Sequence, residues 1–232
     1  MDGYSLAILF VVTGLVLSLN PMTLSVFSAL LAGALGKNHH KNVIHVIGLA
    51  FLLAYSSFLI LFSILLIRLL SIISIDLTAS LGIAIAVASI IFGLVNIKDY
   101  FWYKPKIKIP NNMDAAIHHR TIKKNNPISA TMLGMITGFG SIITTGIALL
   151  CLAIILTLVQ QASPTLIIVP TLCLVLPLII IFVATLSGTK LSAIIKWKQD
   201  SKPLMQLGTG IVYIILGWIL LLVLNGSINS IL

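Results

Sequence analysis

Long apolar runs that carry almost no charge constrain this chain more than any other feature. Six of them lie along the 232 residues: Ser5–Gly36, Val43–Leu69, Leu77–Ile97, Ala130–Leu158, Thr165–Leu186 and Leu207–Leu224. A helix needs about 20 apolar residues to cross a hydrocarbon core about 30 Å thick. Backbone polar groups in hydrocarbon must be paired within the chain, which leaves helix as the default conformation. We therefore expect an all-α membrane protein with six transmembrane helices.

Basic residues are concentrated in three of the five connections between these runs. They lie at Gly36–Lys41, at Lys98, Lys104, Lys106, Lys108, Arg120, Lys123 and Lys124, and at Lys190, Lys196, Lys198 and Lys202, which together hold 13 of the 14 Lys and Arg residues. The positive-inside rule makes these connections cytoplasmic. We expect a multi-pass protein of a prokaryotic cell (plasma or inner) membrane, with both termini outside. The partner implied by the net charge of +9 is the lipid bilayer and not nucleic acid.

The two halves of the chain resemble each other weakly. Asn20-Pro21-Met22-Thr23-Leu24-Ser25 stands near the middle of the first run, and Ser141-Ile142-Ile143-Thr144-Thr145-Gly146 stands near the middle of the fourth. Ile90–Leu94 of the third run likewise matches Ile214–Trp218 of the sixth. Three spans in each half place the halves in opposite orientations, as in inverted-repeat transporters. We expect one polytopic domain over residues 1–232, with repeats at about 5–97 and 130–224 and a basic cytoplasmic loop at about 98–129.

The matched mid-span segments are the candidate solute site. Pro21 removes one helical hydrogen bond, and four glycines at 134, 138, 140 and 146 loosen the fourth span. We expect the first and fourth helices to be kinked or broken near mid-membrane, which is where transporters bind their solutes. The candidate transport-path residues are Asn20, Pro21, Thr23, Ser25, Ser141, Thr144, Thr145 and Gly146. Plain helix packing through small residues is the alternative for the same segments.

Other chemistry is poorly represented in the sequence. No GxSxG, P-loop or HExxH motif occurs, so we expect no soluble enzyme chemistry. His39-His40 and His118-His119 fall in basic loops, and adjacent histidines on a regular element point apart. We expect no metal site and no cofactor. No Asp, Glu, Lys or Arg lies deep in a span, so a proton relay has no obvious carrier.

Several segments resemble the CcdA/DsbD transmembrane-domain family, which belongs to the wider LysE-like superfamily. They are Asn20-Pro21, the stretch Gly93–Tyr103 with Asn-Ile-Lys-Asp-Tyr-Phe-Trp, Leu176-Pro177, and Leu207–Gly210 leading to Gly217. Redox members of this family carry electrons from cytoplasmic thioredoxin to outward-facing thiol proteins and support cytochrome c maturation. They use two cysteines, at positions occupied here by Met22 and Ile143. The resemblance therefore implies the family fold without the family's redox pair.

Three functions follow as hypotheses. The first is a non-redox transporter or exporter of a small solute, with a midplane site between the first and fourth helices. The second is a thiol–disulfide electron relay that uses Cys151 and Cys173, which lie at similar depth in apolar runs; only this hypothesis makes the protein an enzyme. The third is an accessory or scaffold subunit that docks a partner on the basic loop Lys98–Ser129.

Overall fold

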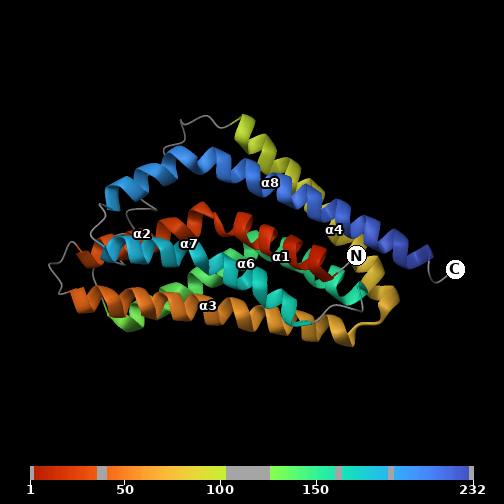
Figure 1. Cartoon of the computed structure of the whole chain (residues 1–232), viewed down its shortest axis with the longest axis horizontal. Helices are drawn as coiled ribbons and strands as arrows, with labels where there is room; N and C mark the ends of the chain where they lie inside the picture. Colours follow the sequence, from red (N-terminus) through yellow and green to blue (C-terminus); the bar gives the residue numbers. More distant parts are fainter. Residues whose placement is uncertain (1–2, 36–40, 103–125, 160–163, 188–190, 230–232) are drawn as a thin grey trace.

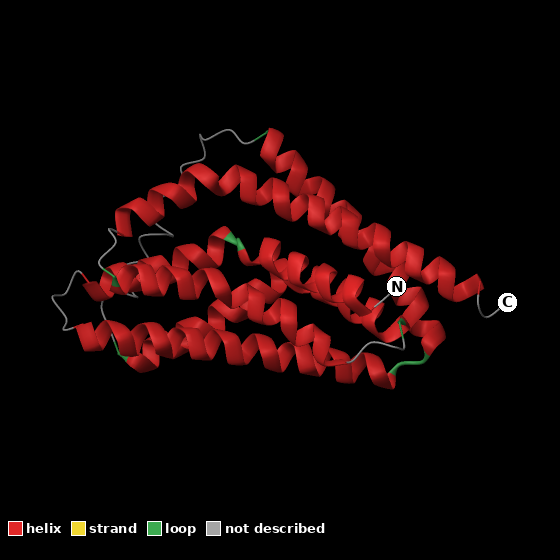
Figure 2. Cartoon of the chain, in the orientation of Figure 1, coloured by secondary structure: helices red, strands yellow, loops and turns green. Residues whose placement is uncertain are grey.

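The computed structural model describes residues 3–35, 41–102, 126–159, 164–187 and 191–229, and these parts of the chain are helical apart from short connectors (Figures 1 and 2). The helices are α1 (Gly3–Ser18), α2 (Pro21–Leu35), α3 (Lys41–Ile72), α4 (Ile75–Phe101), α6 (Pro127–Leu158), the 3-10 turn η1 (Pro164–Ile167), α7 (Ile168–Leu186) and α8 (Leu191–Asn229). Followed from red to blue in Figure 1, successive long helices run in alternate directions. The fold is therefore an antiparallel helical bundle.

The outer surface of this bundle is apolar. Helices α3, α4, α6, α7 and α8 each contain a stretch long and apolar enough to cross a membrane, and α1 with α2 passes the same test as a pair bent by 55°. Ile8, Leu61, Ile136 and Leu222 are each at least 64% exposed. A soluble monomer rarely exposes large apolar patches, whereas lipid is a good solvent for them. The chain is a multi-pass helical membrane protein.

The break between α1 and α2 follows from the dipeptide Asn20-Pro21. Asn20 takes the N-cap position of α2, and its Oδ1 accepts a hydrogen bond of 3.0 Å from the Met22 N–H. Pro21 takes the first helical position, where a missing N–H is not needed and the fixed φ suits a helix start. Since Pro21 cannot donate to the Leu17 carbonyl, α1 ends and α2 starts in a new direction. The predicted break at Asn20-Pro21 is confirmed.

Helix α6 has no such break. The expectation for the fourth helix is a kink or a break; α6 is continuous from Pro127 to Leu158, so the expectation of a break is wrong. The glycines keep their N–H groups, and a single glycine in a helix costs only about 1 kcal/mol relative to alanine. The hydroxyls of Thr144 and Thr145 donate to the Ser141 carbonyl, at 2.9 and 2.7 Å. These polar side chains bond within the helix and do not interrupt it.

The helices pack in two groups. Helix α4 lies along α8 on one side of the molecule in Figure 1, and its contacts with α8 are the most extensive of any helix pair. In the other group α3 packs along α6, and α1 packs along α7. The α4–α8 contact is close because small residues face backbone: a Cβ added at Gly93 would lie 2.7 Å from the Gly210 oxygen, and one added at Gly217 would lie 2.8 Å from the Ala86 oxygen.

Helix α8 is longer than the apolar run that predicted it. It begins at Leu191, so the basic segment around Lys196, Lys198 and Lys202 is helical and not an open loop. Lysine and glutamine are good helix formers. An apolar run predicts only the part of a helix that crosses the membrane, so it does not show a polar extension of that helix. The ends of the predicted loop 98–129 are likewise helical, to Phe101 and from Pro127. The rest of this loop and both histidine pairs lie outside the described residues.

Candidate functional site

A polar cavity of about 180 Å³ lies beside the break between α1 and α2. One water needs only about 10–15 Å³, so there is room for a small solute. Ten residues line the cavity: Leu17, Asn20, Pro21, Phe92, Asn96, Thr144, Thr145, Gln206, Thr209 and Tyr213. They come from α1, α2, α4, α6 and α8, and therefore from both halves of the chain. None of the ten carries a formal charge.

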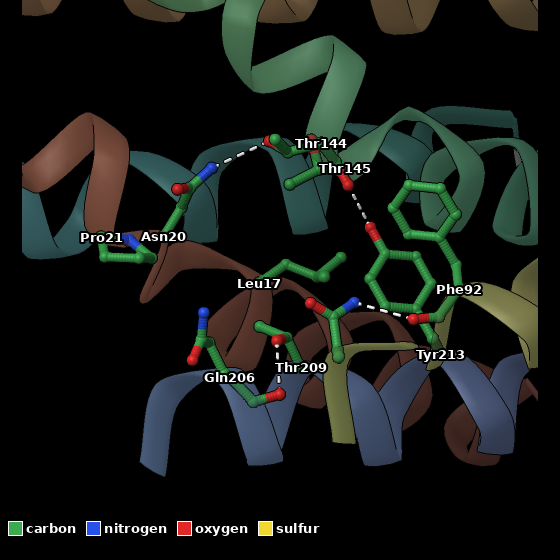
Figure 3. Close-up of a pocket in the computed structure, with 10 residues that line it drawn as sticks. Leu17, Asn20, Pro21, Phe92, Thr144, Thr145, Gln206, Thr209 and Tyr213 are labelled. Carbon is green, nitrogen blue, oxygen red and sulfur yellow. Dashed lines mark hydrogen bonds between the residues drawn. The ribbon is translucent and has the colours of Figure 1, made fainter. Parts of the chain in front are cut away.

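Asn20 joins the break to the centre of α6. Its Nδ2 donates to the Thr144 Oγ1 at 2.9 Å, while its Oδ1 caps α2 through the Met22 N–H. Figure 3 shows the Asn20 side chain pointing toward Thr144 across the top of the cavity. A single amide therefore holds both the bend and the contact between the two predicted site segments.

Helix α8 supplies the opposite wall. The Tyr213 hydroxyl donates to the Thr144 carbonyl, and the Thr209 hydroxyl donates to the Gln206 carbonyl at 2.9 Å (Figure 3). In α4 the Asn96 amide donates to the Phe92 carbonyl at 2.9 Å. Most of the polar groups around the cavity are thus already engaged with the protein.

Thr23 and Ser141 lie outside the cavity lining, in a buried hydroxyl network. Their hydroxyls are 3.0 Å apart, and the Tyr55 hydroxyl of α3 is 3.1 Å from the Ser141 Oγ. All three side chains are at most 3% exposed. This network ties α2, α3 and α6 together next to the cavity.

The remaining predicted residues fall into separate places. The Ser25 hydroxyl donates to the Pro21 carbonyl at 2.7 Å, and Gly146 is buried in α6, where a Cβ added to it would lie 3.5 Å from the Ile142 Cγ2. Neither Ser25 nor Gly146 lines the cavity. Met22 and Ile143, at the family's cysteine positions, are 53% and 65% exposed on the outer face of the bundle.

Cys151 and Cys173 are free and buried, and they face different neighbours. Cys151 lies on α6 next to Ser89 of α4. Cys173 lies on α7 against Gly14 of α1, where a Cβ added to the glycine would be 2.8 Å from the Cys173 Cβ. Both fill helix contacts as small apolar side chains do.

A second cavity, of about 310 Å³, lies between the α1–α2 break and α7. Its lining is almost entirely apolar, and the Ser18 hydroxyl there is bonded to the Leu15 carbonyl at 2.6 Å. In the part of the chain that the structure describes, no three His, Cys, Asp or Glu residues gather as metal ligands could. Of these two cavities, the first is the one lined mainly by polar residues.

Sequence reasoning found four of the ten lining residues and missed the other six. It found Asn20, Pro21, Thr144 and Thr145. The missed residues of α8 stand at 206, 209 and 213, and those of α4 at 92 and 96. These spacings of three and four place each set on one helix face. The available signal was the recurrence of polar residues at helical spacing on α8, at positions 206, 209 and 213.

Comparisons with models of known protein families, with curated proteins and with solved structures found no match. The geometry of the cavity therefore carries the functional argument. It offers amides, hydroxyls and an interrupted helix, and among its lining residues there is no nucleophile–base pair. This arrangement suits reversible binding of a polar molecule.

Proposed function

We propose that the protein transports a small polar solute across a prokaryotic cell membrane, with the cavity beside Asn20 as the solute site. The observation that carries this proposal is the cavity itself, which combines a broken helix with polar side chains from both halves of the chain. Discontinuous helices near the membrane midplane form the sites of many transporters. An empty packing cavity is expected to be apolar, as the second cavity is.

The proposed architecture has six spans in two inverted repeats, the first span being α1 with α2. Two hydrogen bonds between the first and fourth spans support it. In the sequence alignment of the repeats, Asn20 matches Ser141 and Thr23 matches Thr144. Exchanging the halves therefore turns the Asn20–Thr144 pair into the Ser141–Thr23 pair, and both pairs are hydrogen-bonded.

The third and sixth spans give the same support independently. Gly93 matches Gly217 in the alignment, and seven residues before them Ala86 matches Gly210. If each residue is replaced by its match in the other half, the close contact of Gly93 with Gly210 becomes the contact of Gly217 with Ala86. Both contacts are present. The helix pairs follow the same rule: α3 corresponds to α7 and α6 to the span that contains α1, and α3 packs on α6 as α7 packs on α1. Reciprocal contacts of this kind are expected around a two-fold axis in the membrane plane.

Transport would move the α4–α8 pair against the other helices. The pair is joined by backbone-level contacts at Gly93 and Gly210, whereas its boundary with α1, α2 and α6 contains the cavity. Rocking at that boundary would expose the site to each side in turn, as alternating access requires. By the positive-inside rule the ends carrying Lys98 and Lys202 would be cytoplasmic and both termini outside.

The resemblance to the CcdA/DsbD transmembrane-domain family fits this architecture. The chain would be a member that keeps the broken first span and uses it for a solute. Docking of a protein partner on the basic loop Lys98–Ser129 is a further hypothesis. Most of that loop lies outside the described residues. Loss of the redox pair at Met22 and Ile143 removes the family's electron path and leaves the cavity.

Accessibility of the cavity is the first test. In a background with Cys151→Ser and Cys173→Ser, a single Thr209→Cys variant in membrane vesicles is treated with a small charged methanethiosulfonate. We expect labelling of Thr209→Cys, with Leu216→Cys, fully buried on the same helix, as the matched unreactive control. Absence of labelling in both right-side-out and inside-out vesicles would contradict a transport path through this cavity.

Flux is the second test. Proteoliposomes loaded with a mixture of small polar metabolites are followed by mass spectrometry of the released solutes. We expect one or more solutes to leave faster with the wild-type protein than with Asn20→Leu, which removes both the cap and the contact with Thr144. Equal release from wild-type, variant and protein-free vesicles for every solute would argue against transport.

A further inference from the structure

The Gln206 carboxamide differs from every other amide around the cavity. Its Oε1 is buried and has no hydrogen-bond partner, and its Nε2 has none among the described residues. Asn20 uses both its amide atoms within the protein, and Asn96 uses its nitrogen. A buried polar atom without a partner is destabilising, and a molecule bound in the cavity would supply the missing partner.

The position of Gln206 points to a ligand. The residue lines the cavity on α8, facing the Asn20-Pro21 break (Figure 3). Its terminal amide turns easily about the last side-chain bond, so oxygen and nitrogen can both be offered to the cavity. A free carboxamide presents one donor and one acceptor side by side.

The lining restricts the charge of that ligand. None of the ten lining residues is acidic or basic. A charged solute bound against this lining would find no counter-charge in it, which disfavours the binding of ions. An uncharged ligand that both donates and accepts hydrogen bonds does not have the free-energy cost of an unpaired charge.

We propose that the cavity binds a small uncharged solute carrying a carboxamide or urea group, paired with the Gln206 side chain through two reciprocal N–H···O hydrogen bonds. This inference rests on the proposed function, because it names the solute class of the same site. The two bonds would satisfy the buried Oε1 and fix the orientation of the solute.

Three probes of nearly equal size separate the alternatives. Propionamide has the donor and the acceptor, its isomer N,N-dimethylformamide has only the acceptor, and propionamidinium has only donors and a positive charge. Binding to the full-length protein in nanodiscs is measured by saturation-transfer NMR. We expect propionamide to bind about tenfold more tightly than either competitor, because each of them leaves one amide atom of Gln206 unpaired.

Variants locate the effect. Gln206→Leu should abolish the preference for propionamide. Asn225→Leu removes an exposed amide from the outer end of the same helix and should leave the preference intact. Thermal unfolding of both variants verifies that they fold.

The outcomes separate this inference from the proposed function. Propionamide preference that Gln206→Leu removes would support both. Two outcomes would overturn the amide inference and leave the site as a transport path: all three probes bind equally, or propionamidinium binds best, and in either case Gln206→Leu abolishes the binding. No probe signal that depends on Gln206 would also overturn the inference, and labelling of Thr209→Cys then decides the transport proposal by itself.

Discussion

The junction between α1 and α2 and the centre of α6 contain similar polar residues and fold differently. Asn20-Pro21 starts a new helix with a bend of 55°, whereas Ser141–Gly146 stays inside one continuous helix. In α6 the hydroxyls of Thr144 and Thr145 donate to the Ser141 carbonyl of the preceding turn, and every residue from 141 to 146 keeps its backbone N–H, so the helix continues. A proline next to an N-cap residue does break it, because it supplies both an end and a beginning.

The largest expected effect comes from giving α6 the feature it lacks. Ile142→Pro removes a helical hydrogen bond and introduces a clash with the carbonyl four residues earlier, at a cost of about 3 kcal/mol or more. We expect a large loss of stability in denaturant unfolding in mixed micelles. Ile142→Ala shortens the same side chain and leaves the backbone unchanged, so it serves as the control. If Ile142→Pro matched Ile142→Ala, α6 would be as tolerant of a break as the first span.

Removing the cap from the bend should have the next largest effect. Asn20→Ala loses the N-cap bond, worth about 1 kcal/mol, and the bond to Thr144, worth about 1 kcal/mol. Asn20→Ser keeps a capping oxygen but is too short to reach Thr144, so it should recover about half of the loss. The measurement is the free energy of unfolding of the three proteins. Identical values for Asn20→Ala and Asn20→Ser would mean that the cap contributes nothing.

The hydroxyl pair Thr23–Ser141 should have a smaller effect. A double-mutant cycle with Thr23→Val and Ser141→Ala should give a coupling energy of about 0.6 kcal/mol, as is typical for hydrogen bonds between membrane helices. Thr23→Val combined with Thr157→Val, near the far end of α6, should be additive. Additivity in both cycles would show that the two helix centres are not coupled through this pair.

Of these variants, Pro21→Ala should change the free energy of unfolding least and the angle between α1 and α2 most. Alanine supplies an N–H that can bond the Leu17 carbonyl, so α1 and α2 should become straighter, while stability changes by less than about 1 kcal/mol. The distance between spin labels at Ile8 and Ala32, measured by pulsed electron resonance, should lengthen. An unchanged distance would mean that the Asn20 cap alone sets the bend.

The sequence predicted the parts of the fold that depend on the bilayer and on local chemistry. The long apolar helices followed from the apolar runs, and the break followed from Asn20-Pro21. The continuity of α6 was missed because its glycines were expected to interrupt the helix, although each keeps its N–H and costs only about 1 kcal/mol. The helical start of α8 at Leu191 was missed because helix continues beyond the apolar run.

The candidate site was predicted only in part for a different reason. Asn20 and Thr144 were recognisable because both stand in the middle of apolar runs. Gln206 and Tyr213 belong to the site through the packing of α8 against α6, and their distance from Thr144 in sequence gives no hint of that contact. Tertiary packing, which a single sequence does not display, decides which polar residue meets which.

The backbone-level contacts of the glycines also limit how the sequence can drift. A Cβ at Gly14 would lie 2.6 Å from the Pro170 Cα, and one at Gly134 would lie 2.7 Å from the Phe51 oxygen, much as at Gly93 and Gly217. Even alanine would clash with the neighbouring backbone at these positions, whereas leucine, isoleucine and valine can replace one another on the lipid-facing surface. Descendants of a common ancestor would then share few identical residues apart from Asn20-Pro21 and these glycines. A sparse pattern of this kind is a better probe for distant relatives than identity along the whole chain.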